Sequence, residues 1–304
     1  MLQQTTVPVV KQRYALWLDE FPDIHAVAKA EQTQVLRAFE GLGYYARARH
    51  LHQTAQHIHQ HGWPEDFVSL RKLPGLGDYT AKTIMSRCFK KPVLAFDVNM
   101  HRLFGRLYMK YPLSKQDEKD LEQALAPLQK QHNPAIMGQA LMRFAQSECK
   151  KNMPACAHCL FSSICRARRH NAQQSLFPEK RKKKVYLESI VLFIRRGDDV
   201  LIEKREEGIG KGMYSLPRLS VEEFTQLSGQ LSGVFLALKS RTHTYTHHQE
   251  KLMPHFLNLK EPLNWDFGPR CYFENEKKLQ ELPFMAIYRD ILKSIEQENL
   301  NTLF

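Results

Sequence analysis

The sequence predicts a mainly helical domain followed by a smaller α+β domain, and three features of its 304 residues support this fold class. Across residues 9–143 apolar side chains recur every three or four positions, the period of an amphipathic α-helix. Four cysteines then fall within seventeen residues, and from residue 185 short β-branched and aromatic runs replace the helical pattern. A chain of this length exceeds one typical domain, so two hydrophobic cores are expected.

The first part of the chain divides into helices at short turns that contain glycine or proline. The pair Phe21-Pro22 ends the first helical segment, because proline disfavours a helical conformation in the residue before it. Further along, two groups of apolar residues at helical spacing mark faces that we expect to be buried. They are Val35, Leu36, Phe39 and Leu42 in one helix and Leu121, Leu125 and Leu128 in another.

Residues 73–81, Leu-Pro-Gly-Leu-Gly-Asp-Tyr-Thr-Ala, lie between an apolar segment and a new helix. Gly75 and Gly77 permit a tight turn, and backbone N–H groups at the start of the next helix can point at a phosphate oxygen. This is the helix–hairpin–helix pattern, and a plain turn between helices is the alternative. Asp97, in the apolar frame of residues 93–99, favours the DNA-binding interpretation.

The cysteine run has the spacing C-x6-C-x2-C-x5-C and consists of Cys149, Cys156, Cys159 and Cys165. Thiolate ligands at this density suit an iron–sulfur cluster or zinc. Zinc ribbons usually show two C-x2-C pairs and this run has one, so a cluster is the first choice, although zinc stays open. Two disulfides are disfavoured, because a chain of this length does not need them.

The polar, basic stretch 166–184 contains Pro178 and the basic cluster 180–184, and it predicts an exposed connector. Beyond it, residues 185–194 and 200–202 predict two strands, joined by a hairpin turn at Gly197-Asp198-Asp199. The predicted organisation is therefore a helical domain at 1–165, a linker at 166–184 and an α+β domain at 185–304.

The chain carries 44 Lys and Arg against 32 Asp and Glu, a formal net charge of +12, and its pI is near 9.4. Such an excess of positive charge is self-repulsive unless a polyanion binds to it. Nucleic acid is therefore the expected partner, and a generally basic protein is the alternative. No run of eighteen apolar residues predicts a membrane span, and reduced thiols favour an intracellular setting.

Five segments, taken in their order and spacing, resemble the helix–hairpin–helix DNA glycosylase superfamily and, within it, the MutY-type adenine DNA glycosylases. They are residues 1–5 (Met-Leu-Gln-Gln-Thr), 39–49, 73–81, 97–99 (Asp-Val-Asn) and the cysteine run. The resemblance implies a helix–hairpin–helix glycosylase fold, a [4Fe–4S] cluster on the four cysteines and a Nudix-like C-terminal domain. It also implies a monomer in the bacterial cytoplasm that hydrolyses the N-glycosidic bond of adenine opposite 8-oxoguanine or guanine in double-stranded DNA.

Cleavage of an N-glycosidic bond develops positive charge on the sugar and negative charge on the base, so two carboxyl groups with different roles assist it. The resemblance assigns the catalytic carboxylate at the sugar to Asp97 and an assisting role to Asn99, while a helix N-cap is a compatible role for Asp97. Tyr79 stands where endonuclease III-like lyases carry the lysine that forms a Schiff base. Tyrosine cannot form an imine, so excision without strand cleavage is expected, with Tyr79 orienting Asp97 or the sugar, or simply packing at the hairpin.

The second carboxyl group of the family is a glutamate two residues before the methionine of the Met-Leu-Gln-Gln-Thr motif, and that methionine is Met1 here. Because the printed sequence lacks it, we expect turnover to fall by at least about 10²–10⁴-fold, the usual contribution of general acid–base catalysis. Two explanations are open: a start assigned at an internal methionine, which we favour, and a shortened protein that still binds DNA.

Apolar and amide side chains near the start match the family segment that wedges into the duplex beside the flipped base. An ordinary helix start is the alternative for them, and core packing with solvated charge is the alternative for the aromatic and cationic group 44–49. The expected DNA-binding residues are Leu2, Gln3, Gln4, Tyr44, Tyr45, Arg47, Gly75 and Gly77.

In the second domain, residues 208–217 match the family's aromatic-x-x-Pro segment, and no Nudix box follows, so pyrophosphatase activity is not expected. Residues 244–247, Thr-Tyr-Thr-His, resemble the family's Phe-Ser-His recognition loop. The resemblance assigns 8-oxoguanine recognition to Tyr245, Thr246 and His247, since hydroxyl and imidazole groups can bond to the oxidised purine. For His243 and His248, an ordinary imidazole is favoured over a metal ligand.

Two other functions agree with parts of the sequence. An endonuclease III-like glycosylase/lyase is disfavoured by Tyr79 and by the second domain. A cluster-containing mismatch DNA-binding protein without catalysis is the non-enzymatic alternative.

Overall fold

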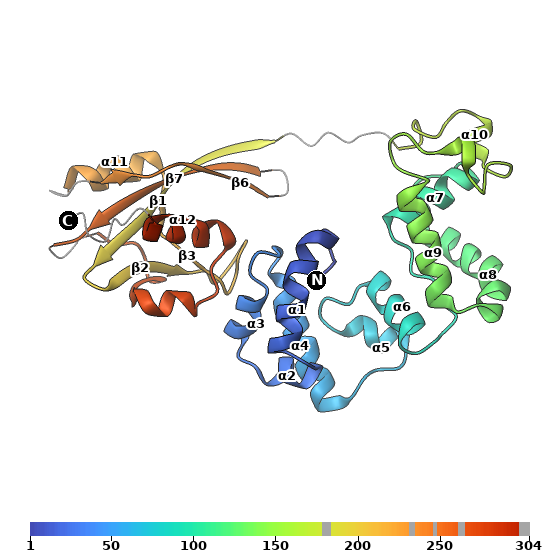
Figure 1. Cartoon of the computed structure of the whole chain (residues 1–304), viewed down its shortest axis with the longest axis horizontal. Helices are drawn as coiled ribbons and strands as arrows, with labels where there is room; N and C mark the ends of the chain where they lie inside the picture. The colour runs from blue at the N-terminus through green and yellow to red at the C-terminus, as the bar shows by residue number, and fades with distance from the viewer. Residues whose placement is uncertain (178–183, 231–234, 246–247, 261–264, 298–304) are drawn as a thin grey trace. The chain divides into compact units, whose positions relative to one another are not determined.

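The computed structural model describes residues 1–177, 184–230, 235–245, 248–260 and 265–297. Its contacts form two compact units, one made of Met1–Gln60 with Lys182–Phe304 and the other of His61–Arg181. Figure 1 shows the elements of both. The sequence prediction placed the boundary between residues 165 and 185, so the contacts group the first sixty residues differently. In the described ranges, no helix has the length and apolarity that crossing a membrane requires.

In its described residues, 61–177, the regular elements of the unit His61–Arg181 are all helices. Its elements are α5 (Phe67–Lys72), α6 (Asp78–Arg87), α7 (Val98–Tyr108), α8 (Lys115–Gln131), α9 (Pro134–Ser147), the 3₁₀ turn η1 (Cys156–His158) and α10 (Arg166–Arg169). Leu121 and Leu125 of α8 pack in the core with Phe96 and Phe104, as predicted. Leu128 does not, because its side chain lies on the exposed side of α8.

The other unit begins with α1 (Val7–Glu20), α2 (Ile24–Lys29), α3 (Gln32–Ala38) and α4 (Ala46–His61). Phe21 is the C-cap of α1, which confirms the predicted break at Phe21-Pro22. The predicted face formed by Val35, Leu36, Phe39 and Leu42 is buried.

The C-terminal part of this unit is α+β, as predicted, and is built on a mixed sheet. Its elements are β1 (Val185–Arg196), β2 (Asp199–Lys204), β3 (Tyr214–Ser215), β4 (Arg218–Leu219), α11 (Val221–Gln230), β5 (Leu236–Ala237), β6 (Arg241–Tyr245), β7 (His248–Asn258), β8 (Cys271–Asn275), η2 (Glu276–Gln280) and α12 (Ala286–Gln297). The central strands β1 and β7 run parallel, in register from Val185↔His248 to Arg195↔Asn258. Strand β2 pairs with β1 through Arg196↔Asp199, which confirms the predicted hairpin. Gly197 has a φ of +60° there, a left-handed conformation typical of tight hairpin turns.

Side chains of β1 alternate between two cores, as a strand requires. Ile190, Leu192 and Ile194 pack with Leu227 of α11 on one face. Val191 and Phe193 face a second core, which includes Tyr288, Ile291, Leu292 and Ile295 of α12.

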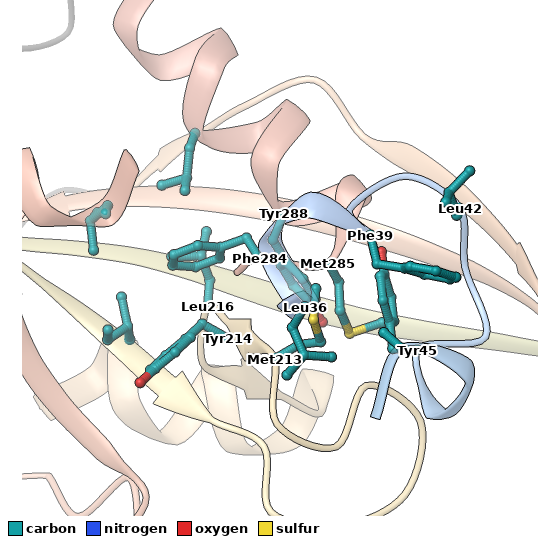
Figure 2. Packing of buried hydrophobic residues seen from close by; sticks show 14 of the residues in the cluster. Leu36, Phe39, Leu42, Tyr45, Met213, Tyr214, Leu216, Phe284, Met285 and Tyr288 are labelled. Atoms are coloured by element: carbon teal, nitrogen blue, oxygen red, sulfur yellow. The ribbon is translucent and has the colours of Figure 1, made fainter. Parts of the chain in front are cut away.

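The second core also contains the N-terminal helices, which explains why residues 1–60 group with the α+β part. Figure 2 shows Leu36, Phe39, Leu42 and Tyr45 beside side chains of the C-terminal segments, namely Met213, Tyr214, Leu216, Phe284, Met285 and Tyr288. The contact is close: a Cβ added at Gly212 would lie 3.0 Å from Cδ1 of Leu36. Polar contacts add to it, since Arg289 Nε lies 3.0 Å from Glu40 Oε1 and Arg49 donates to the carbonyl of Lys211 at 2.5 Å.

Candidate active site and DNA-binding surface

The predicted helix–hairpin–helix is formed by α5 and α6. Gly75 has a φ of +76°, which L side chains rarely adopt, so the turn itself requires glycine there. Gly77 is the N-cap of α6 with a φ of −75°, and a Cβ built on it would meet nothing within 4 Å. Neither backbone strain nor crowding requires glycine at 77, and glycine is among the residues favoured at an N-cap, so phosphate binding at the start of α6 stays a prediction.

Asp97 is half-buried at the start of α7 and is its N-cap. Its Oδ1 accepts hydrogen bonds from the backbone N–H groups of Asn99 at 3.0 Å and Met100 at 2.8 Å. Its Oδ2 accepts one from Nδ2 of Asn99 at 2.6 Å. The predicted capping role is confirmed, and the same bonds fix the orientation of the carboxylate, which a catalytic role requires.

A chain of hydrogen bonds connects Asp97 to the cysteine loop. Arg102 donates from Nη2 to Oδ1 of Asn99 at 3.0 Å, and from Nε to the carbonyl of Cys149 at 2.8 Å. A third bond from Nη2 reaches the carbonyl of Ala145 at 2.7 Å. The side chain of Asn99 therefore bonds to the candidate catalytic carboxylate on one side and to Arg102 on the other, and Arg102 in turn bonds to the carbonyl of Cys149 at the start of the cysteine loop.

The four predicted cysteine ligands line one cavity, together with Leu103, Arg106 and Phe161. All four thiols are free, which contradicts the disulfide alternative. Burial raises the pKa of the Cys159 thiol, and the three other cysteines add to this. In the described part of the chain no three ligating side chains have the geometry to hold a single metal ion. The donor set is all sulfur, which fits an iron–sulfur cluster.

Arg106 of α7 is 1% exposed and bonds to several carbonyls of the cysteine loop. Its guanidinium donates to the carbonyls of Cys149 at 3.2 Å, Lys150 at 2.6 Å, Lys151 at 2.8 Å and Gln173 at 2.8 Å. It also lies 3.3 Å from Sγ of Cys149. Sequence reasoning missed Arg102 and Arg106, although an arginine pair four residues apart following Asp97 on one helix face was the available signal.

Tyr79 lies on the first turn of α6 and is 40% exposed. Its hydroxyl contacts Sδ of Met142 at 3.7 Å, a weak hydrogen bond. Tyr79 lines a cavity whose wall includes Val93, Leu94 and Ala95, the segment that leads into Asp97. This places Tyr79 near the candidate catalytic segment, and its role there stays a prediction.

The wedge candidates Leu2, Gln3 and Gln4 lie in an exposed segment before α1 and are not the helix start that was the alternative for them. Gln4 has a φ of +58°, which is not helical. Leu2 is 58% exposed, as insertion into a duplex requires.

Arg47 holds this segment in place. Its guanidinium donates to the carbonyls of Met1 at 2.6 Å, Gln3 and Leu42 at 2.7 Å, and to Oγ1 of Thr5 at 2.8 Å. The prediction that Arg47 binds DNA directly is therefore corrected: the guanidinium is occupied by protein acceptors and positions the candidate wedge.

Two adjacent tyrosines have opposite environments. Tyr44 is 50% exposed and has a φ of +48°. Tyr45 is 7% exposed in the core shown in Figure 2, where burial raises the pKa of its hydroxyl. The prediction that Tyr45 contacts DNA is wrong, because its ring is covered by the C-terminal segments, while Tyr44 stays a candidate.

Of the predicted 8-oxoguanine recognition residues, Tyr245 lies at the end of β6, opposite His248 at the start of β7. Thr246 and His247 lie outside the described residues. The ring centroid of Tyr245 is 4.9 Å from that of His243 and 5.4 Å from that of His248.

Comparison with known proteins places these motifs in a family. Residues 1–130 match the HhH-GPD superfamily base excision DNA repair protein family. This match covers less than half of the chain and supports the helix–hairpin–helix fold predicted for its helical part. A solved structure of a thermostable thymine-DNA glycosylase aligns with 56% of this chain and 80% of its own, with a TM-score of 0.51 and 22% identity, which supports the fold of the helical part.

Curated relatives carry the name adenine DNA glycosylase. The one from Schizosaccharomyces pombe is 36% identical over 174 residues, covering 55% of this chain and 38% of the relative. One from Buchnera aphidicola subsp. Baizongia pistaciae is 30% identical and covers 72% and 64%. Another, from subsp. Schizaphis graminum, is 27% identical and covers 91% and 81%, so the likeness extends through the α+β part. The chain thus covers less than two thirds of the length of the first two relatives.

Proposed function

We propose that this chain is an adenine DNA glycosylase of base excision repair. Its substrate would be double-stranded DNA with adenine opposite 8-oxoguanine or guanine, and it would act as a monomer in the cytoplasm. The observation that carries the proposal is Asp97, a half-buried carboxylate oriented by three hydrogen bonds at the start of α7, in the unit that holds the helix–hairpin–helix.

Asp97 would act on the sugar of a flipped adenine nucleotide. As the glycosidic bond breaks, positive charge develops on the sugar, and a carboxylate in fixed orientation stabilises that charge without reorganising. Asn99 would keep the carboxylate aligned, because its amide donates to Oδ2 at 2.6 Å. Tyr79 has no amine, so the products would be free adenine and an abasic site with an intact strand.

Four cysteines would hold a [4Fe–4S] cluster: Cys149, Cys156, Cys159 and Cys165. When bound, such a group supplies the positive charge that buried thiolates need and closes the loop between them. The hydrogen bonds of Arg102 would then transmit the position of this loop to Asn99.

The departing adenine needs a proton donor. The family resemblance places a glutamate two positions before Met1, so the decisive experiment compares the printed chain with one that carries Glu-Val ahead of Met1. Single-turnover release of adenine from an adenine–8-oxoguanine duplex is measured together with binding on the same sample. We expect the extended chain to be at least about 100-fold faster, with equal binding.

Equal rates for the two chains would contradict the need for this acid. Tight mismatch binding without excision by either chain would replace the proposal with a DNA-binding protein. A Schiff base trapped by borohydride would replace it with a glycosylase/lyase.

A further inference from the structure

A buried carboxylate lies beneath the end of β6, which carries the predicted recognition residue Tyr245. Glu250 on β7 is 3% exposed. Its Oε1 accepts from Oγ of Ser189 at 2.6 Å and from Nη1 of Arg218 at 2.9 Å. Its Oε2 accepts from the hydroxyl of Tyr245 at 3.2 Å. One side chain therefore connects four strands: β1, β4, β6 and β7.

The strand register explains this meeting. His243 lies directly opposite Glu250 in the β6–β7 ladder, and Tyr245 lies two residues further along β6, on the same face. On β1, Leu187 pairs with Glu250. Ser189 is two residues further along β1 and therefore lies on the same face of the sheet. In Figure 1 β6 and β7 lie side by side.

Because Glu250 is buried, its carboxylate needs these hydrogen-bond partners. A buried carboxylate is tolerated only when charged and hydrogen-bonding partners surround it, and both oxygens of Glu250 have such partners. Burial, with Glu250 adding to it, raises the pKa of the Tyr245 hydroxyl, so the hydroxyl stays protonated and donates. The ring is also bordered by the rings of His243 and His248. Tyr245 is thus fixed at its hydroxyl and along its ring.

We propose that Glu250 is a positioning residue for reading the base opposite the adenine: through its hydrogen bond to Tyr245 it sets the orientation in which the end of β6 meets an 8-oxopurine. The inference rests on the proposed function and deepens it. Arg218 and Ser189 hold Glu250 in place, so specificity for the oxidised base depends on a polar cluster inside the sheet.

The test measures the preference of the protein for an adenine–8-oxoguanine duplex over an adenine–guanine duplex. Binding is followed with a 2′-fluoro adenine nucleotide, which resists excision. We expect Tyr245→Phe and Glu250→Gln each to lower the preference by about threefold to tenfold, the worth of one hydrogen bond. The double variant should lose no more than the more affected single variant, because both changes act on the preference through the contact between Tyr245 and Glu250. Thermal unfolding of each variant is measured alongside.

Matched controls are Tyr186→Phe and Glu188→Gln, which change an exposed tyrosine and an exposed glutamate on β1. Both should keep the wild-type preference. If Glu250→Gln fails to fold, Tyr245→Phe decides, since it removes only the hydroxyl. A Tyr245→Phe preference equal to the wild type, or additive losses in the double variant, would overturn the inference. Equal binding of the two duplexes by the wild type would overturn the inference alone, whereas no binding of either duplex would overturn the proposed function, and the inference with it.

Discussion

The segments around Asp97 and around Tyr245 are both anchored by arginines, but the acceptors differ. Arg102 and Arg106 donate mainly to main-chain carbonyls of the cysteine loop. Arg218 donates to a carboxylate within a hydrogen-bonded sheet. The candidate catalytic segment therefore depends on a loop whose shape a bound group would set, whereas the candidate recognition segment is fixed by the strand ladder itself.

The largest effect is expected at the catalytic carboxylate. Asp97→Asn, made in the chain extended by Glu-Val, should lower single-turnover excision by at least about 100-fold, because the charge at the sugar is lost. An amide can keep the N-cap hydrogen bond, so folding and DNA affinity should stay close to those of the parent. Retained excision would remove Asp97 from the chemistry.

Arg106→Ala should be the most disruptive change in the helical unit. It leaves several buried carbonyls without a donor, so we expect the free energy of unfolding to fall by about 3 kcal/mol. Iron bound per chain, read from visible absorbance, should fall with it. Arg166→Ala, which removes an exposed arginine of α10, is the matched control. Unchanged stability and iron content would mean that Arg106 does not organise the loop.

Removal of the proposed iron–sulfur cluster should affect the segment around Asp97 and leave the segment around Tyr245 unchanged. We expect backbone amides of residues 149–165 and of α7 to exchange hydrogen at least about tenfold faster after iron removal, since the loop then loses its closure. Amides of β1 and β7 should exchange at the same rate before and after. Equal acceleration in both regions would contradict the comparison.

The smallest expected effect is a loss of stability at alkaline pH that involves Cys271 of β8. Burial raises the pKa of the Cys271 thiol to about 11, with Glu203 and Asp266 adding to it. The folded thiol keeps its proton where the unfolded one loses it, so this stabilisation is complete below about pH 9 and is lost as the pH rises towards 11.

Unfolding by denaturant between about pH 8 and 11 should therefore show a shallower fall in stability for Cys271→Ala than for the wild type. Cys88→Ala, at an exposed cysteine, should follow the wild-type curve. Parallel curves for all three proteins would exclude a contribution from Cys271.

The sequence by itself determined the local structure and the inventory of chemical groups. Pro22 ended α1, the glycines at 75 and 197 required left-handed turns, and Asp97 capped α7. These features depend on a few neighbouring residues, whose conformational limits are the same in any fold. The period of apolar residues likewise predicted a helical part followed by an α+β part.

Only the tertiary structure decided which groups meet. Tyr44 and Tyr45 are neighbours in sequence, yet one is exposed and the other is buried against residues more than 160 positions away. The guanidinium of Arg47 bonds to the segment before α1, and residues 1–60 pack with the C-terminal core. Glu250 found its partners on three other strands. Side-chain partners are set by packing across long chain separations, which local patterns of residues do not encode.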